Sequence, residues 1–98
     1  MVTVGSIVRF EVKPGKEAEF EHFLKEVLLD VQQAPGTTAW FALRLSSSTF
    51  GVFDAFPDED ARQTHFAAGF VRAEKAADLL EHPPTFEKVD VLAAKLPG

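Results

Sequence analysis

Three residue types that often carry out chemistry are missing from this chain of 98 residues, which has no cysteine, no tyrosine and no asparagine. Without Cys there can be no disulfide, zinc–thiolate site, iron–sulfur cluster or thiol nucleophile. A chain without Cys also fits a reducing compartment, so we expect a cytoplasmic protein. Without Tyr and Asn, few phenol or amide donors remain for catalysis.

Several partner classes lack support as well. The net charge is −5 and no Lys/Arg cluster occurs, which argues against nucleic acid as a partner because phosphate contacts need concentrated positive charge. No apolar run approaches the ~20 residues of a membrane span, and the N-terminus lacks the layout of a signal peptide. The three His residues show no metal-ligand spacing, and no glycine-rich phosphate loop is present. We therefore expect no metal, no cofactor, no nucleic acid and no membrane contact.

The chain is rich in apolar residues, at 46%, with ten Phe and one Trp. This fraction is enough to fold, and the length predicts one domain over residues 1–98. Aromatic residues with so few polar tips suit an apolar cavity or a buried interface.

Hydrophobic periodicity predicts four strands and two helical regions. The strands are expected at 2–12, 38–45, 49–56 and 85–96, and the helices at 17–33 and 58–80. Asp58 is a plausible N-cap of the second helical region, and Gly69 is expected to divide that region into two pieces. The order β-α-β-β-α-β predicts an α+β, ferredoxin-like fold: an antiparallel sheet with helices on one face.

The strands carry apolar residues on both faces. Neighbours in a strand point to opposite sides of the sheet, yet the pairs 40–41, 52–53 and 91–92 are apolar at both positions. Helices can cover one face, so we expect a homodimer that covers the other through the sheet face. The alternative is a monomer with scattered surface aromatics.

Three short segments, with a histidine after the last, carry a resemblance to a known family. They are Val-Lys-Pro-Gly-Lys at 12–16, Pro-Gly-Thr at 35–37 and Phe-Asp-Ala-Phe at 53–56, with His65 nine residues after the last segment ends. In this order they resemble the antibiotic biosynthesis monooxygenase family of dimeric α+β barrel proteins. The resemblance implies two sheets packed face to face and a separate pocket in each subunit between sheet and helices. Members include cofactor-free monooxygenases of anthrone-like or quinol substrates, haem-degrading relatives and proteins without known activity.

Some residues depart from the family pattern. Many relatives carry an acid, one residue and then an aromatic, often Trp, on the third strand, and here Phe56 takes the aromatic position. The haem-degrading branch uses an Asn, a Trp and a ligand His, whereas this chain offers Glu74 near the ligand position and no Asn. Haem degradation is accordingly disfavoured. The anthrone enzymes use pocket Asn and Tyr residues, so an oxygenase mechanism here needs other donors.

His65 and Asp54 are the predicted catalytic residues. An imidazole titrates near neutral pH, which suits a general base. Asp54 lies among apolar residues, and a carboxylate there needs a partner, so it could orient His65 or take a proton itself. The structural alternatives are a His65 bonded to a backbone carbonyl or an acid, and an Asp54 paired with Arg44, with Arg62 or with a Lys or Arg of a partner subunit.

Five further residues are predicted to bind substrate: Trp40, Phe41, Arg44, Phe66 and Phe70. Trp40 could stack on a planar ring and Arg44 could hold an oxygen with its forked donors. A two-residue serine turn would place Phe41 directly across from Asp54. The structural alternatives are Trp40 in a dimer core, Arg44 in a rim ion pair and the Phe residues in the hydrophobic core.

These residues favour a cofactor-independent monooxygenase of a small aromatic substrate, quinol or anthrone-like. A base would remove a proton, and the electron-rich anion would react with dioxygen. The alternative from another class is a non-catalytic dimeric module that binds a small hydrophobic ligand. An isomerase or cyclase that uses the same base without oxygen also remains open.

Overall fold

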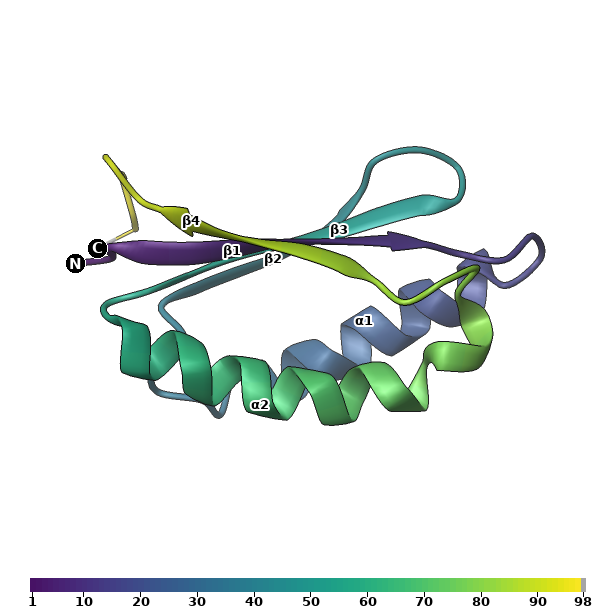
Figure 1. Cartoon of the computed structure of the whole chain (residues 1–98), viewed down its shortest axis with the longest axis horizontal. Coiled ribbons are helices and arrows are strands. Elements are labelled where there is room, and N and C mark those ends of the chain that lie inside the picture. The colour runs from purple at the N-terminus through teal and green to yellow at the C-terminus, as the bar shows by residue number, and fades with distance from the viewer. Residues whose placement is uncertain (98) are drawn as a thin grey trace.

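The computed structural model describes residues 1–97 as one sheet with two long helices (Figure 1). In chain order the elements are β1 Val4–Glu11, α1 Glu17–Val31, β2 Ala39–Arg44, β3 Thr49–Phe56, α2 Glu59–Lys75, the 3-10 turn η1 Ala77–Leu79 and β4 Thr85–Asp90. This order confirms the predicted α+β, ferredoxin-like fold. No helix among the described residues is long and apolar enough to cross a membrane.

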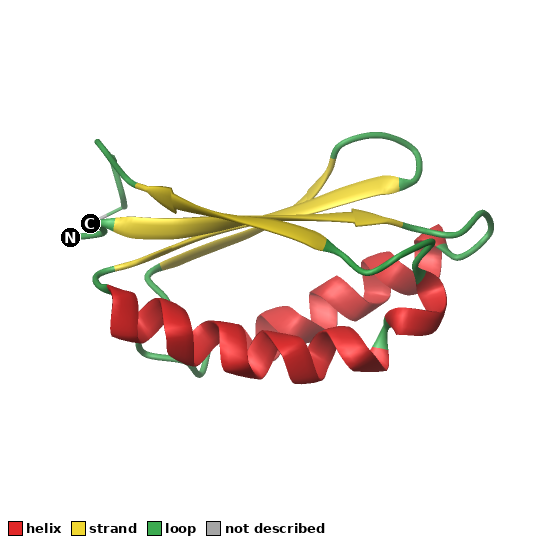
Figure 2. Cartoon of the chain, in the orientation of Figure 1, coloured by secondary structure: helices red, strands yellow, loops and turns green. Residues whose placement is uncertain are grey.

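The four strands form one antiparallel sheet in the order β2-β3-β1-β4. Both helices lie against the same face of it, which leaves the opposite face uncovered by any element of residues 1–97 (Figures 1 and 2). We call the two sides the helix-covered face and the open face. The cavity described below lies between the helix-covered face and the two helices.

The core lies between the helix-covered face and α1. Phe20 of α1 is fully buried, and its ring centroid lies 5.0 Å from that of Phe10 on β1 and 5.3 Å from that of Phe50 on β3. Leu24 and Val31 are also buried, on the same stripe of the helix. The amphipathic spacing of this helix therefore fixes which of its faces meets the sheet.

Helix α2 runs unbroken through Gly69, so the predicted division at that residue is wrong. The Asp58 carboxylate caps the helix by accepting a hydrogen bond from the Ala61 N–H at 2.9 Å. Acidic residues follow in the first turn, and Arg72 and Lys75 occupy the last turn, where each sign of charge suits the helix dipole. A single glycine costs a helix only about 1 kcal/mol, which these caps and charges offset.

The last strand is shorter than predicted and ends at Asp90 instead of residue 96. It pairs only with β1, whose first residue is Val4, and Val4 lies opposite Asp90. The described residues beyond that point have no neighbouring strand to pair with. A single backbone hydrogen bond follows the strand, from the Val91 N–H to the Thr3 carbonyl. The strand therefore stops where its partner stops.

The β2–β3 register places Trp40 across from Asp54, and the expectation that Phe41 would face Asp54 is wrong. The Leu45 N–H donates to the Thr49 carbonyl, so these two residues close the turn. The turn between them therefore has three residues, the serines at 46–48, instead of the two that were expected. A slip of one residue turns every side chain of a strand to the other face. Trp40 thus lies on the helix-covered face, and Phe41 lies on the open face.

Candidate functional site

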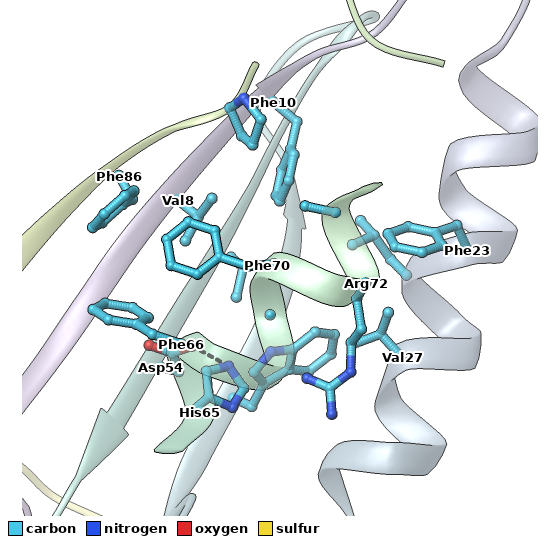
Figure 3. A pocket seen from close by; sticks show the side chains of 16 residues that line it. Val8, Phe10, Phe23, Val27, Asp54, His65, Phe66, Phe70, Arg72 and Phe86 are labelled. Carbon is cyan, nitrogen blue, oxygen red and sulfur yellow. Dashed lines mark ion pairs between the residues drawn. The ribbon is translucent and has the colours of Figure 1, made fainter. Parts of the chain in front are cut away.

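A cavity of about 120 Å³ lies between the helix-covered face and the two helices (Figure 3). All four strands and both helices contribute to its walls. Most of the lining is aromatic or aliphatic, including Val8, Phe23, Trp40, Val52, Phe70 and Phe86. Only three lining residues are ionisable: Asp54, His65 and Arg72. The cavity is therefore an apolar space with a few polar groups at defined places, the usual composition of a small-molecule site.

Asp54 and His65 lie within hydrogen-bonding distance of each other at the cavity wall. Oδ2 of Asp54 lies 3.0 Å from Nε2 of His65, and the two side chains are 1% and 10% exposed. Ser6, directly across from Asp54 in the β1–β3 register, donates its hydroxyl to the other carboxylate oxygen. Both oxygens of this buried carboxylate thus have partners, which is the condition for keeping a charge out of water. The predicted contact between Asp54 and His65 is present.

The second nitrogen of His65 faces a different residue. Nδ1 lies 3.4 Å from the Thr37 hydroxyl oxygen, in the loop before β2. The imidazole ring also packs on Phe56, with 5.3 Å between ring centroids. When Asp54 is ionised, Nε2–H is the donor to it, and Nδ1 is the nitrogen that can accept a proton. The loop, β3 and α2 together hold the ring in one orientation.

Three aromatic rings form one wall of the cavity. The Phe86 centroid lies 5.2 Å from that of Phe66 and 6.3 Å from that of Phe70. In Figure 3 these rings lie on the side of the cavity where β4 passes, with the Asp54–His65 pair below them. Phe66, Phe70 and Trp40, three of the predicted substrate-binding residues, thus line the same cavity as His65.

Two of the predicted site residues lie outside this cavity. Phe41 is 54% exposed on the open face, where it stacks on Phe53 at 6.5 Å between centroids. Arg44 lies at the β2 edge, paired with Glu21 and positioned 4.5 Å from the Phe50 ring centroid. Both border a second, more open hollow beside β2. The structure brings neither to the Asp54–His65 pair.

Arg72 is a lining residue that the sequence reasoning missed. Its side chain is 19% exposed and extends from α2 beside Val27 of α1 (Figure 3). A signal for it was present in the sequence, because 65, 69 and 72 follow the i, i+4, i+7 spacing of one helix face. The predicted break at Gly69 concealed that relation.

The described residues contain no cluster of three or more His, Asp or Glu side chains that could hold a metal ion. The His65–Asp54 pair has no third ligand of that kind beside it. The described side chains at the site offer the chemistry of an acid–base pair in an apolar cavity.

Comparison with known proteins gives a family and a fold. No protein-family profile and no curated protein matches the chain. A solved structure of a protein of unknown function from Nitrosomonas europaea is 50% identical, with a TM-score of 0.91 over 100% of this chain and 97% of its own. Two structures carry the provisional name antibiotic biosynthesis monooxygenase. One from Nitrosomonas europaea is 18% identical, with a TM-score of 0.82 over 92% of this chain and 90% of its own. One from Caulobacter crescentus is 21% identical, with a TM-score of 0.79 over 94% of this chain and 92% of its own.

The fold is that of the antibiotic biosynthesis monooxygenases, as the sequence resemblance indicated. The chain belongs to the same family as the Nitrosomonas protein of unknown function, to which half of its residues are identical. These likenesses establish the fold, and the activity must be argued from the site itself.

Proposed function

We propose that this protein is a cofactor-independent monooxygenase that binds a small aromatic substrate in the cavity above. The observation that carries the proposal is the position of the Asp54–His65 pair at the wall of a cavity lined almost wholly by apolar side chains. An acid–base pair in such surroundings can remove a proton from a bound hydroxyl, and the dry walls protect the anion that results.

The chemistry needs only a base and dioxygen. His65 takes the substrate proton at Nδ1, because Nε2 is already committed to Asp54. The Thr37 hydroxyl, 3.4 Å from Nδ1, can hydrogen-bond the ring at this nitrogen. The electron-rich anion then reacts with O2 at a ring carbon, the proton held by His65 returns to the peroxide anion that forms, and the resulting hydroperoxide loses water. In total one C–H-bearing carbon becomes a carbonyl, one oxygen atom of O2 enters the product and the other leaves as water.

The cavity volume favours a single-ring substrate. An apolar protein cavity of roughly 150 Å³ holds one benzene ring, and the cavity here measures about 120 Å³. A quinol ring matches this space. A three-ring anthrone exceeds this volume and would have to project beyond it, past the exposed rings of Phe70 and Phe86, so we favour the quinol class.

A second candidate function is a non-catalytic module that binds a small hydrophobic ligand. The observation in its favour is that both oxygens of Asp54 are already bonded, to Ser6 and to His65. A fully partnered buried pair also serves as a structural tie between sheet and helix. The two functions differ in a single measurable property, the consumption of oxygen.

Oxygen uptake across a panel of quinols and anthrones tests the proposal. We expect uptake above the buffer rate with single-ring quinols and its loss in His65→Ala. The matched control is His22→Ala on α1, whose side chain is 75% exposed and pairs only with Glu26, and this variant should keep full activity. Uptake at the buffer rate with every substrate would favour the binding module. Full activity in His65→Ala would refute the assignment of the base.

The same proposal includes a homodimer formed through the open face. The support is an open-face patch that we define as Ile7, Phe41, Leu43, Leu45 and Phe53, of which the first four are 42–54% exposed. Ile7, Phe53 and Phe41 lie side by side across β1, β3 and β2. If a second copy of the chain placed its own open-face patch against this one, both patches would be removed from water. The cytoplasmic location expected from the sequence stays a prediction.

Sedimentation analysis at micromolar concentration tests the dimer. We expect the unaltered protein to have a mass near twice the 10.8 kDa of one chain. The mass of the Phe41→Glu variant should shift toward that of a single chain. The control is Leu29→Glu, the same kind of change at a 63% exposed apolar residue of α1. A single-chain mass for the unaltered protein would refute the dimer, and equal effects of the two substitutions would place the interface elsewhere.

A further inference from the structure

Three arginines, the buried Arg62, the partly buried Arg72 and the exposed Arg44, differ in how many partners their guanidinium groups have. Arg62 donates to both carboxylate oxygens of Glu59 and to the Gly5 and Val89 carbonyls. Arg44 has Glu21 and the Phe50 ring. Arg72, although only 19% exposed, makes no side-chain hydrogen bond within residues 1–97, and its ion-pair partner is the exposed Asp30 carboxylate at 3.7 Å, which is beyond hydrogen-bonding distance. The first two arginines are tied into the fold, and the third retains free donors at the cavity.

Arg72 and His65 lie on the same face of α2 with a gap between them. They are seven residues apart, which corresponds to about 10 Å along the helix axis. Gly69 lies between them on this face, and a Cβ atom built on it would meet nothing within 4 Å. The backbone positions of His65 and Arg72 therefore flank open space over the glycine, and the Arg72 side chain reaches back along the helix toward the level of His65 (Figure 3).

We propose that Arg72 recognises a carboxylate on the ligand of this cavity. The ligand is then a single aromatic ring with its hydroxyl toward the Asp54–His65 pair and an acid group on a short side chain. The ring occupies the space over Gly69, and the carboxylate takes the forked donors of the guanidinium, a geometry that arginine matches better than any other side chain. This inference deepens the proposed function and rests on it for the use of the cavity.

The existing contact of Arg72 would oppose such a ligand only weakly. Asp30 is 69% exposed, and an ion pair at the surface with this exposure contributes little, so the carboxylate can return to water. The chain as a whole has a net charge of −5, which disfavours anions near its surface. A ligand acid consequently needs one dedicated cation, and Arg72 is the only Lys or Arg among the lining residues.

Fluorescence of Trp40 provides a direct binding assay, because it is the only Trp in the chain and it lines the cavity. The probes are 3-(4-hydroxyphenyl)propanoate and its methyl ester, which differ in the charge that Arg72 would bind. We expect the acid to bind at least about tenfold more tightly than the ester at low salt, as for a charge-assisted hydrogen bond. Arg72→Met should remove this preference and leave the affinity of the ester within about twofold.

Two further variants complete the test. Lys75→Met removes the same charge from an exposed position in the same helical turn and should keep the preference for the acid. Gly69→Leu should weaken both probes, because it fills the space between His65 and Arg72. Equal binding of acid and ester to the unaltered protein, an unchanged preference in Arg72→Met, or no binding of either probe would each overturn the proposal. The assay measures binding and does not depend on oxygen uptake. A result that refutes the monooxygenase proposal can therefore be told apart from a result that refutes carboxylate recognition by Arg72.

Discussion

The same substitution, glycine to alanine, is expected to change stability in opposite directions at Gly5 and Gly69. At Gly5 of β1, an added Cβ atom would lie 2.5 Å from the backbone carbonyl oxygen of Asp54, whereas ordinary contact begins at 3.4 Å. The strands must therefore separate by the difference, about 0.9 Å, at the position where β1 pairs with β3. Forced repacking of this kind costs about 1–3 kcal/mol.

At Gly69 the added methyl group meets open space, and the backbone is already helical. Alanine is favoured over glycine inside a helix by about 0.8–1.0 kcal/mol, so Gly69→Ala should stabilise the protein by roughly that amount. In a domain of this size 1 kcal/mol moves the melting temperature by about 4–8 °C. We thus expect Gly69→Ala to melt several degrees higher and Gly5→Ala several degrees or more lower.

Thermal and urea unfolding at one fixed protein concentration would measure both effects, since self-association would otherwise shift the apparent stability. A lower melting temperature for Gly69→Ala would show that α2 needs a bend or a contact at this residue. An unchanged melting temperature for Gly5→Ala would show that the close approach of the Asp54 carbonyl is not maintained in solution. Either result would refute the reasoning from the geometry.

The remaining predictions concern the buried pair, the core and one ion pair. His65→Ala leaves the Asp54 carboxylate buried with one partner fewer, so it should lower the free energy of unfolding by about 3 kcal/mol, and no loss in urea unfolding would show that the pair is not coupled to folding. Phe20→Ala, at a fully buried ring, should cost about 3–5 kcal/mol in the same measurement; a cost below about 1 kcal/mol would contradict the packing described. The hydrogen bond from Arg62 holds the pKa of Glu59 below its ordinary value of 4.5. Glu59 therefore stabilises the fold above that pH and loses this contribution as the pH falls through its lower folded pKa. Glu59→Gln should accordingly lower stability near neutral pH more than near about pH 3, and a pH-independent effect would contradict this.

The order of elements could be predicted from local pattern alone. The alternation in the strands, the apolar stripe that includes Phe20 and Leu24, and the capping Asp58 each depend on residues close together in sequence. The unbroken α2 could not be predicted in this way, because the cost of Gly69 is small and only the sum of all contributions decides the outcome.

The candidate site divides in the same manner. The contact between Asp54 and His65 was one of several arrangements that the sequence allowed. Its geometry depends on the strand register, and a turn one residue longer moved Phe41 away and brought Trp40 in. The partner of Asp54 on the sheet, Ser6, is 48 residues distant in the chain. Contacts of this kind are set by tertiary pairing, which no local pattern encodes.

The sequence by itself determined the absence of thiol and phenol side chains and of asparagine, the order of the elements and an excess of apolar residues on both faces of the sheet. Only the tertiary structure decided which apolar residues face the helices and which form the open-face patch, because a single step in register exchanges the two. It likewise decided that Arg72, and not Arg44, is the cation at the cavity, because that depends on how α2 packs across the sheet.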